Sequence, residues 1–303
     1  MELLSILAEK NPNKIKEKIQ PVLESFHKEG VDLQERLYFF EPFYYINYSV
    51  DIKSIKEYPI KDFINIFKFC IANAICEYIL EVEEPNLIEY IISTDYCYFD
   101  VRERSEIFRN SINILSEENA DSFISKPNTV SMKSKILNNL IDYLDDNNEI
   151  NVEGFVLFRL KDYLLEINEI VEKAVEDFLV DKEYNEFIKL LKYFVDVQES
   201  KVDQIHVIFD EGKRFKLYDK YRKPLNNDYV NSVAAELAEN NINQDDLLIS
   251  ALITIAPKEI LVHNLPRFNR GKIIQTLEKI FPEKVHCCNS CELCGCTINI
   301  HKE

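Results

Sequence analysis

The sequence predicts a helix-dominated α+β fold. A helical body with an N-terminal β-hairpin is followed by a small C-terminal α/β unit made of a hairpin plus a βαβ motif. Apolar residues recur at helical spacing through most of the chain up to about residue 200. Beyond that point, short β-branched runs alternate with helical segments. We therefore expect two domains, a mostly helical acidic domain over 1–200 and a small α/β domain over 201–303 that ends in a cysteine-rich tail.

The elements of the first domain follow the apolar pattern. Residues 13–29 are expected to form a helix that Pro21 kinks or splits, because proline removes a helical hydrogen bond. Residues 37–52 are dense in aromatic and β-branched side chains and predict two strands around Glu41-Pro42. Further expected elements are helices at 61–81, 86–93, about 102–116 and about 132–145, a polar loop at 116–134 and a turn at 145–149.

The clearest helical block begins after Asn151, a predicted N-cap. Apolar residues recur at helical spacing from Val156 to Phe178, which predicts one helix of about 28 residues and roughly 42 Å. Asp181 is expected to cap a separate helix over 182–199.

The second domain is predicted to begin with two strands over 205–219 that are joined by a turn at 210–213. Helices are expected at about 229–240 and 244–256. The strand, helix and strand predicted over 258–288 have the length of a βαβ unit.

The net charge of −17 is distributed unevenly along the 303 residues. Residues 1–200 contain 22 Lys and Arg against 39 Asp and Glu, a balance of −17, whereas residues 201–303 contain 14 of each. The first two-thirds of the chain would repel a phosphate backbone. Nucleic acid, if it binds, is expected to bind the C-terminal third.

We expect a cytoplasmic protein that is not inserted in a membrane. The N-terminal segment has an acidic second residue and an apolar stretch too short for a secretory signal. The most apolar stretch, residues 67–80, includes Lys68 and Glu77 and therefore predicts an amphipathic or buried helix.

Five of the eight cysteines lie within the last seventeen residues, a cluster that suggests chemistry. Cys288, Cys291 and Cys294 form two overlapping CxxC steps, which let thiolates converge on one ion. The bacterial ferredoxin pattern requires a further cysteine at position 298, where this chain has Ile298, so the iron–sulfur match fails. Zinc is therefore the favoured metal, although no second CxxC completes a zinc ribbon.

A fourth zinc ligand can come from the predicted βαβ unit. Both strands of such a unit end at the same edge of the sheet, so His263 and the Cys288 region are expected to meet there. His286 and His301 are further candidate ligands. A thiol-exchange role and a thiol-rich tail without a fixed partner remain alternatives at this point.

Two basic regions are weaker candidates for anion or nucleic-acid contact. Six Lys and Arg residues lie within 213–223, and the predicted hairpin places Lys213, Arg214 and Lys216 among its exposed positions. The loop 264–272 contributes Arg267 and Arg270 at a predicted helix start. For the hairpin, a solvated face or a docking surface for the acidic helical body is the commoner explanation. For the loop, the commoner explanation is a capped helix start with surface arginines.

No catalytic residue is predicted. The chain has no Ser/His/Asp, HExxH or nucleophile-elbow pattern. Arg159, Lys161 and Asp162 are expected to face solvent or to form ion pairs, and His206, beside apolar neighbours in a strand, is interpreted as structural.

Residues 151–200, NVEGFVLFRLKDYLLEINEIVEKAVEDFLVDKEYNEFIKLLKYFVDVQES, resemble the YtxC-like family, which is named for a sporulation role in spore-forming Firmicutes. Residues 246–264, DLLISALITIAPKEILVHN, are similar to the C-terminal part of that family. The resemblance implies a cytoplasmic protein of endospore-forming bacteria. It implies no defined reaction and no established catalytic residues.

Three functions therefore stay open. The first is a non-enzymatic, sporulation-associated protein that binds a protein partner and is stabilised by zinc at its C-terminal end. The second is a redox or metal-dependent enzyme with its site at the carboxyl edge of the C-terminal sheet. The third is a nucleic-acid binder that uses the basic hairpin at 213–223.

Overall fold

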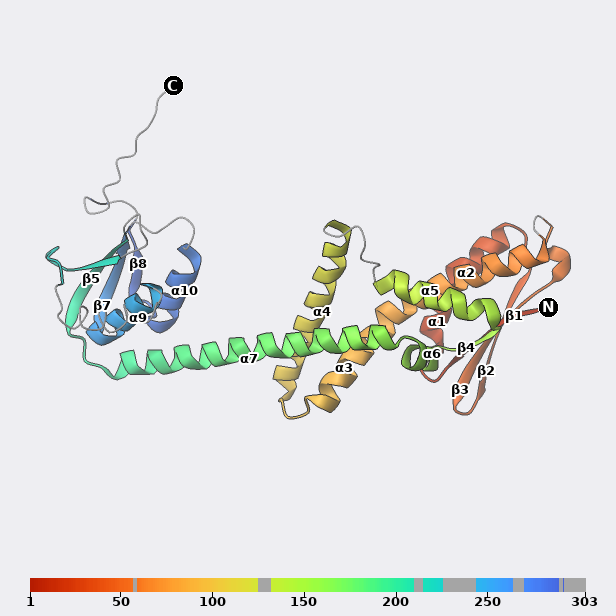
Figure 1. Ribbon diagram of the computed structural model, residues 1–303, viewed down its shortest axis with the longest axis horizontal. Coiled ribbons are helices and arrows are strands. Elements are labelled where there is room, and N and C mark those ends of the chain that lie inside the picture. The colour runs from red at the N-terminus through yellow and green to blue at the C-terminus, as the bar shows by residue number, and fades with distance from the viewer. Residues whose placement is uncertain are drawn as a thin grey trace, which may run out of the picture. The chain divides into compact units, whose positions relative to one another are not determined.

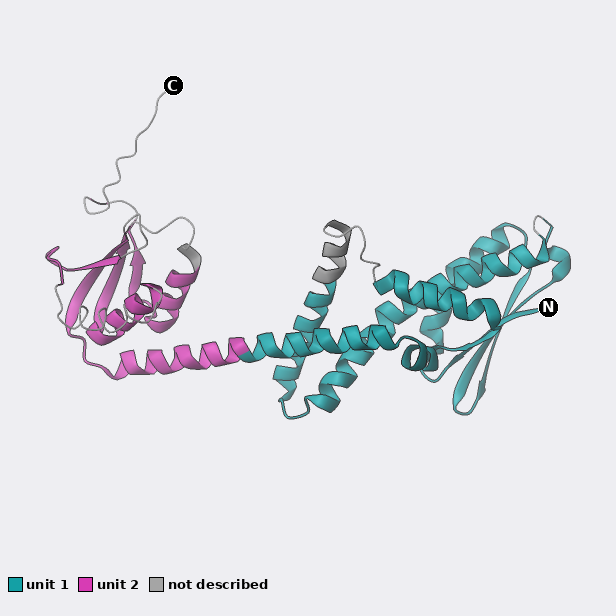
Figure 2. Cartoon of the chain, viewed as in Figure 1, with its two compact units in different colours: residues 1–179 teal, residues 180–303 magenta. Residues whose placement is uncertain are grey.

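The computed structural model describes residues 1–56, 59–124, 132–209, 215–225, 244–263, 270–288 and 291. Helices dominate, and two small sheets confirm the predicted α+β class (Figure 1). The chain divides into two compact units, Met1–Leu179 and Val180–Glu303 (Figure 2). This division lies within a helix, whereas the sequence pattern places the boundary at residue 200, after that helix has ended.

The first unit combines one sheet with a set of helices. Its elements are β1 (Glu2–Ala8), α1 (Pro12–Lys28), β2 (Leu33–Phe40), β3 (Phe43–Val50), the 3₁₀-helix η1 (Ile52–Ser54), α2 (Ile60–Tyr78), the π-helix η2 (Ile79–Glu83), α3 (Glu84–Asp95), α4 (Val101–Ile124), α5 (Met132–Asp146), β4 (Glu149–Asn151), α6 (Val152–Arg159) and the start of α7 (Lys161–Val197).

The sheet of the first unit has the strand order β2-β3-β1-β4. The predicted hairpin around Glu41-Pro42 is confirmed as the antiparallel pair β2 and β3. β1 was not predicted, and it is an interior strand that pairs antiparallel with β3 and parallel with β4. Six consecutive residues of β1 are buried, so its sequence lacks the alternation by which a half-exposed strand is identified.

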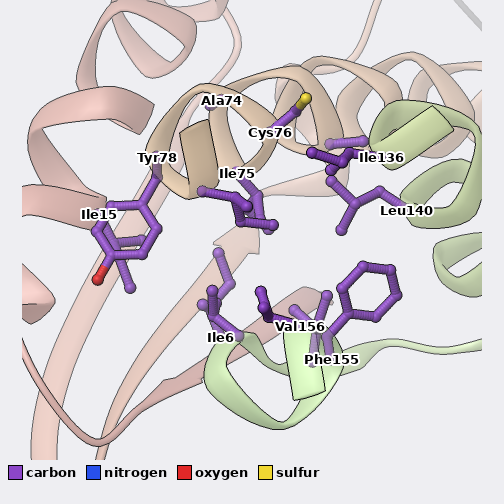
Figure 3. Close-up of a cluster of buried hydrophobic side chains, with 14 of the residues drawn as sticks. Ile6, Ile15, Ala74, Ile75, Cys76, Tyr78, Ile136, Leu140, Phe155 and Val156 are labelled. Carbon is purple, nitrogen blue, oxygen red and sulfur yellow. The ribbon is translucent and has the colours of Figure 1, made fainter. Parts of the chain in front are cut away.

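The core of the first unit lies between the sheet and the helices. α2 packs against both α1 and α5. Figure 3 shows Ile75 of α2 near Leu140 of α5, with Ile6 of β1 and Phe155 of α6 on the other side of the cluster. All four side chains are at most 4% exposed.

Several predicted helix boundaries were wrong. α1 runs through Pro21 without a break, because one apolar face, which includes Ile19 and Leu23, is buried on both sides of the proline. α4 continues to Ile124, into the segment that was predicted to be a loop.

The long block after Asn151 also divides differently from the prediction. The helix breaks at Leu160, which has φ −100° and ψ 43° and is itself buried, so α6 and α7 are separate helices. Asp181 is exposed within a continuous α7 and does not begin a new helix. The N-cap prediction is confirmed, since Oδ1 of Asn151 accepts a hydrogen bond of 2.7 Å from the Gly154 amide.

α2 is the core helix of the first unit. Within the described residues, the stretch Ile60–Asp95 is the one segment long and apolar enough to span a membrane, and 56% of its most apolar window is buried inside the protein. Burial of this kind fits the core helix of a soluble protein. Lys68 is also buried, and its Nζ donates to the Leu144 and Asn147 carbonyls at 2.6 and 3.1 Å.

The second unit contains the end of α7 and a second sheet. Its further elements are β5 (Val202–Phe209), β6 (Phe215–Asp219), α9 (Gln244–Ile255), β7 (Pro257–His263), α10 (Arg270–Ile280) and β8 (Val285–Cys287). The strand order is β6-β5-β7-β8. β5 and β6 are antiparallel, and β7 and β8 are parallel, as the predicted hairpin and βαβ unit require. The turn predicted at 210–213 and the helix predicted at about 229–240 lie outside the described residues.

Candidate metal centre

The two faces of the second sheet differ in chemistry. Alternate residues of β5 and β7, including Ile205, Val207, Ile260 and Val262, are buried and pack in the core of the second unit. The residues between them form the other face, which we call the polar face because most of its side chains are polar. It includes Gln204 and His206 of β5, Glu259 and His263 of β7, and His286 of β8, together with Ile208 and Leu261.

The carboxyl ends of β7 and β8 bring His263 next to Cys288. Val262 pairs with Cys287 in the parallel register, and the Cys288 amide donates to the Val262 carbonyl at 2.8 Å, so the ladder continues one residue beyond β8. His263 and Cys288 are therefore neighbours on the polar face. Because successive side chains of a strand alternate, Cys287 faces away from them.

His263, Cys288 and Cys291 form a compact group of metal-ligating side chains. The ligand atoms of the three residues all lie within 4.8 Å of one another. Nδ1 of His263 is 3.4 Å from Sγ of Cys291. His263 is 1% exposed, and both cysteines are partly buried. Among the residues that the structure describes, this is the one group of at least three His, Cys, Asp or Glu side chains with such a spacing.

The spacing of the group fits a tetrahedral zinc ion. Zinc binds thiolate sulfur at about 2.3 Å and imidazole nitrogen at about 2.0–2.1 Å. Two such ligands at a tetrahedral angle lie roughly 3.6 Å apart, from the same bond lengths. The nitrogen–sulfur distance of 3.4 Å between His263 and Cys291 is close to this value. An ion therefore requires little movement of these two side chains.

A second histidine contacts the group. Nδ1 of His206 lies 3.0 Å from Nε2 of His263, and the two ring centroids are 5.2 Å apart. In the parallel pair of β5 and β7, Ile208 is opposite His263, so His206, two residues earlier on the same face, is its diagonal neighbour. His206 is 8% exposed. The burial of His206 fits its interpretation as structural, and the contact places it beside the group.

The electrostatics of the site favour neutral imidazoles. Burial lowers the pKa of His206, and the positive charge of Arg222 adds to this effect. Burial also lowers the pKa of His263, with further contributions from His206 and Arg222. A neutral imidazole has the lone pair that metal coordination requires.

The other predicted ligands have different positions. Cys294 and His301 lie outside the described residues. His286 is on the polar face but is exposed, and its Nε2 is 3.9 Å from a carboxylate oxygen of Glu259. The structure thus brings together His263, Cys288 and Cys291, and it adds His206. That fourth residue could have been found from the sequence only by pairing β5 with β7 in the correct register.

The basic region 213–223 is partly described. Lys216 is exposed on β6, whereas Lys213 and Arg214 lie outside the described residues. Lys220 forms an ion pair of 2.7 Å with Asp203, which also binds Lys258 at 3.0 Å. Hydrogen bonds from these two lysines lower the pKa of Asp203 to about 2. One of the six positive charges is thereby neutralised, which reduces the attraction of this surface for phosphate.

Within the described residues, the remaining predicted positions form no second group of candidate site residues. Arg267 lies outside the described residues, and Arg270 is the first residue of α10. Arg159, Lys161 and Asp162 are exposed, as expected. The Arg159 guanidinium lies over the ring of Tyr143, at 5.6 Å from its centroid.

Comparison with known proteins identifies the family to which the chain is similar. The model of the YtxC-like family matches residues 69–286. The uncharacterized protein YtxC of Bacillus subtilis (strain 168) is 24% identical over 210 residues, which cover 69% of this chain and 73% of that protein. No solved structure matches the chain. The matched region includes His206 and His263 but ends before Cys288, so the thiols of the site lie beyond it.

Proposed function

The chain belongs to the YtxC-like family, and we propose that it is a cytoplasmic, sporulation-associated binding protein with a zinc-stabilised C-terminal unit. His263, Cys288 and Cys291 would supply three ligands. Cys294, the next member of the CxxC series, is the fourth ligand that the sequence predicts. The observation that supports this proposal is the convergence of three ligand atoms within 4.8 Å. The sporulation role rests on the family resemblance.

The donor set favours zinc over other common ions. Thiolate and imidazole are the ligands of structural zinc sites, whereas calcium and magnesium bind oxygen. Thiols remain reduced in the cytoplasm, where clustered cysteines more commonly bind metal than form disulfides. Burial lowers the pKa of His263 and so favours the neutral imidazole, the form that binds zinc.

The position of the site favours a structural role. The ligands come from the end of β7, from the residue after β8 and from Cys291, so one ion would tie Cys291 to the sheet. A set of four protein ligands leaves no open coordination position for a substrate. The zinc would therefore stabilise the C-terminal end of the unit and would not catalyse a reaction.

Partner binding is supported by exposed aromatic side chains in the first unit. Near the turn between β2 and β3, Tyr38 is 47% exposed and Phe40 is 70% exposed, and as alternate residues of β2 they lie on the same face of the hairpin. Large exposed aromatic residues that lie together are typical of protein interaction surfaces.

Metal content tests the proposal directly. The protein is purified under reducing conditions without chelator, and zinc and iron are measured by mass spectrometry. About one zinc per chain is expected, with loss of zinc in Cys288→Ala, Cys291→Ala and Cys294→Ala. Cys97→Ala, which removes an exposed cysteine of the first unit, is the matched control and should retain zinc. A substoichiometric mixture of zinc and iron in the wild-type protein would contradict the proposal.

A thiol redox role is the second candidate, because the same geometry supports it. Sγ of Cys291 lies 3.4 Å from an imidazole nitrogen, and the CxxC spacing places a second thiol nearby. An imidazole that takes up the thiol proton would form an ion pair with the reactive thiolate. In metal-free protein, rapid alkylation of Cys291 near neutral pH, together with a Cys288–Cys291 disulfide after mild oxidation, would favour this candidate over zinc.

A further inference from the structure

The contact between His206 and His263 has no role in the ligand set described above. Two ring nitrogens, Nδ1 of His206 and Nε2 of His263, face each other at 3.0 Å. At this distance one nitrogen donates a proton and the other accepts it. The contact therefore couples the tautomers of the two rings.

The position of Nδ1 of His263 determines which tautomer of this residue can bind a metal. Nδ1 of His263 points to Cys291 and lies 3.4 Å from its Sγ. A nitrogen that binds a metal must present an unprotonated lone pair. The proton of neutral His263 must then be on Nε2, which faces His206.

We propose that His206 is a positioning residue for the metal site. It accepts the Nε2–H of His263 and so fixes the ring orientation and the tautomer that present Nδ1 to an ion beside Cys288 and Cys291. This inference rests on the proposed zinc site. It adds a specific coordinating atom of His263 and a residue from β5 that is not itself a ligand.

Burial makes this hydrogen bond important for metal binding. His263 is 1% exposed and His206 is 8% exposed, so solvent water has little access to replace the acceptor. Metal-bound histidines almost always donate their second N–H to a carboxylate, a carbonyl or water, and loss of such a partner weakens metal binding about 10- to 100-fold.

Three variants separate positioning from general structural effects. His206→Phe keeps a planar ring of similar size and removes the acceptor. His206→Gln keeps a side-chain acceptor. His286→Phe is the matched control, since His286 lies on the same face of the sheet but outside the group. Affinity is measured by titration with Co²⁺, followed by its sulfur charge-transfer absorption, and by zinc competition with a chelator.

We expect His206→Phe to weaken metal binding about 10- to 100-fold, His206→Gln to recover part of this loss, and His286→Phe to bind like the wild type. In zinc-loaded wild-type protein, ¹⁵N NMR should assign the metal-bound nitrogen of His263 to Nδ1 and the protonated nitrogen to Nε2. This spectrum tests the proposal even if His206→Phe fails to fold.

Two results would overturn the inference while leaving the zinc proposal intact. One is unchanged affinity in folded His206→Phe, and the other is coordination of His263 through Nε2. Wild-type protein that binds neither zinc nor Co²⁺ would overturn both the zinc site and the role of His206.

Discussion

Substitution of Lys68 tests how much the hydrogen bonds between α2 and the end of α5 stabilise the first unit. Lys68 lies in the middle of α2, is 8% exposed, and donates from Nζ to the carbonyls of Leu144 and Asn147 at 2.6 and 3.1 Å. These carbonyls are at the end of α5, where no further helical turn provides donors. Lys68 therefore caps one core helix from within another. The substitution Lys68→Met retains the apolar stem of the side chain and removes both hydrogen bonds.

The expected loss follows from two opposing contributions. A hydrogen bond to a charged group contributes about 1.5–3 kcal/mol, so two bonds give roughly 3–6 kcal/mol. Burial of the ammonium group opposes this gain and also lowers the pKa of Lys68. With a buried carbonyl left unsatisfied in the variant, we expect a net loss of about 2–3 kcal/mol in the free energy of unfolding of the first unit.

Hydrogen exchange measured by mass spectrometry gives the stability of each unit separately, which matters because two units need not unfold together. A loss of 2–3 kcal/mol corresponds to about 30- to 150-fold faster exchange of the core amides of α2 and α5. The control is Lys61→Met, at an exposed position of the same helix, with an expected change within about 0.5 kcal/mol. If both variants exchange at the wild-type rate, the reasoning about Lys68 is refuted.

Three further predictions concern the first unit. Buried Glu84 accepts a 2.8 Å hydrogen bond from Tyr163, and burial raises its pKa. The folded state therefore favours the protonated carboxyl. The wild type should lose stability relative to Glu84→Gln as pH rises above about 4.5. Denaturant titrations at several pH values measure this difference in stability, and a difference that does not change with pH would contradict the prediction. Asn151→Ala should cost about 1 kcal/mol by loss of the N-cap of α6, with Asn151→Asp near wild type in thermal unfolding. Leu140→Ala, at a fully buried position, should cost about 2–5 kcal/mol in denaturant unfolding, whereas the exposed Leu157→Ala should change stability by at most about 0.5 kcal/mol.

Elements with a clear local signal could be predicted from the sequence. The aromatic hairpin around Glu41-Pro42 and the strand, helix and strand of the second unit were found because their patterns are short-range. β1 was missed because it is buried on both faces, so its residues show neither a period of two nor a helical period. The break at Leu160 was missed for a related reason, since buried apolar residues continue on both sides of it.

The candidate site also contains residues that the sequence predicts and a residue that only the structure identifies. The grouping of His263 with Cys288 and Cys291 could be predicted, because residue type and the shared edge of a βαβ unit suffice to bring them together. His206 could not be assigned, because its contact depends on β5 pairing in parallel with β7. The sequence pattern identified β5 only as half of a hairpin, and pairing between strands distant in the chain has no local signature.

The interior position of β1 has a consequence for synthesis of the protein. One partner of β1, the strand β3, follows it closely in the sequence, whereas the other partner, β4, is synthesised only at Glu149–Asn151. The ribosome adds roughly 100 residues between β3 and β4, which takes about 5–20 s at 5–20 residues per second. During that interval the unpaired backbone edge of β1 can pair with another chain, and an unpaired strand edge is prone to aggregation. Slow translation would lengthen this exposure, so the yield of folded protein should depend on elongation rate through the first helices.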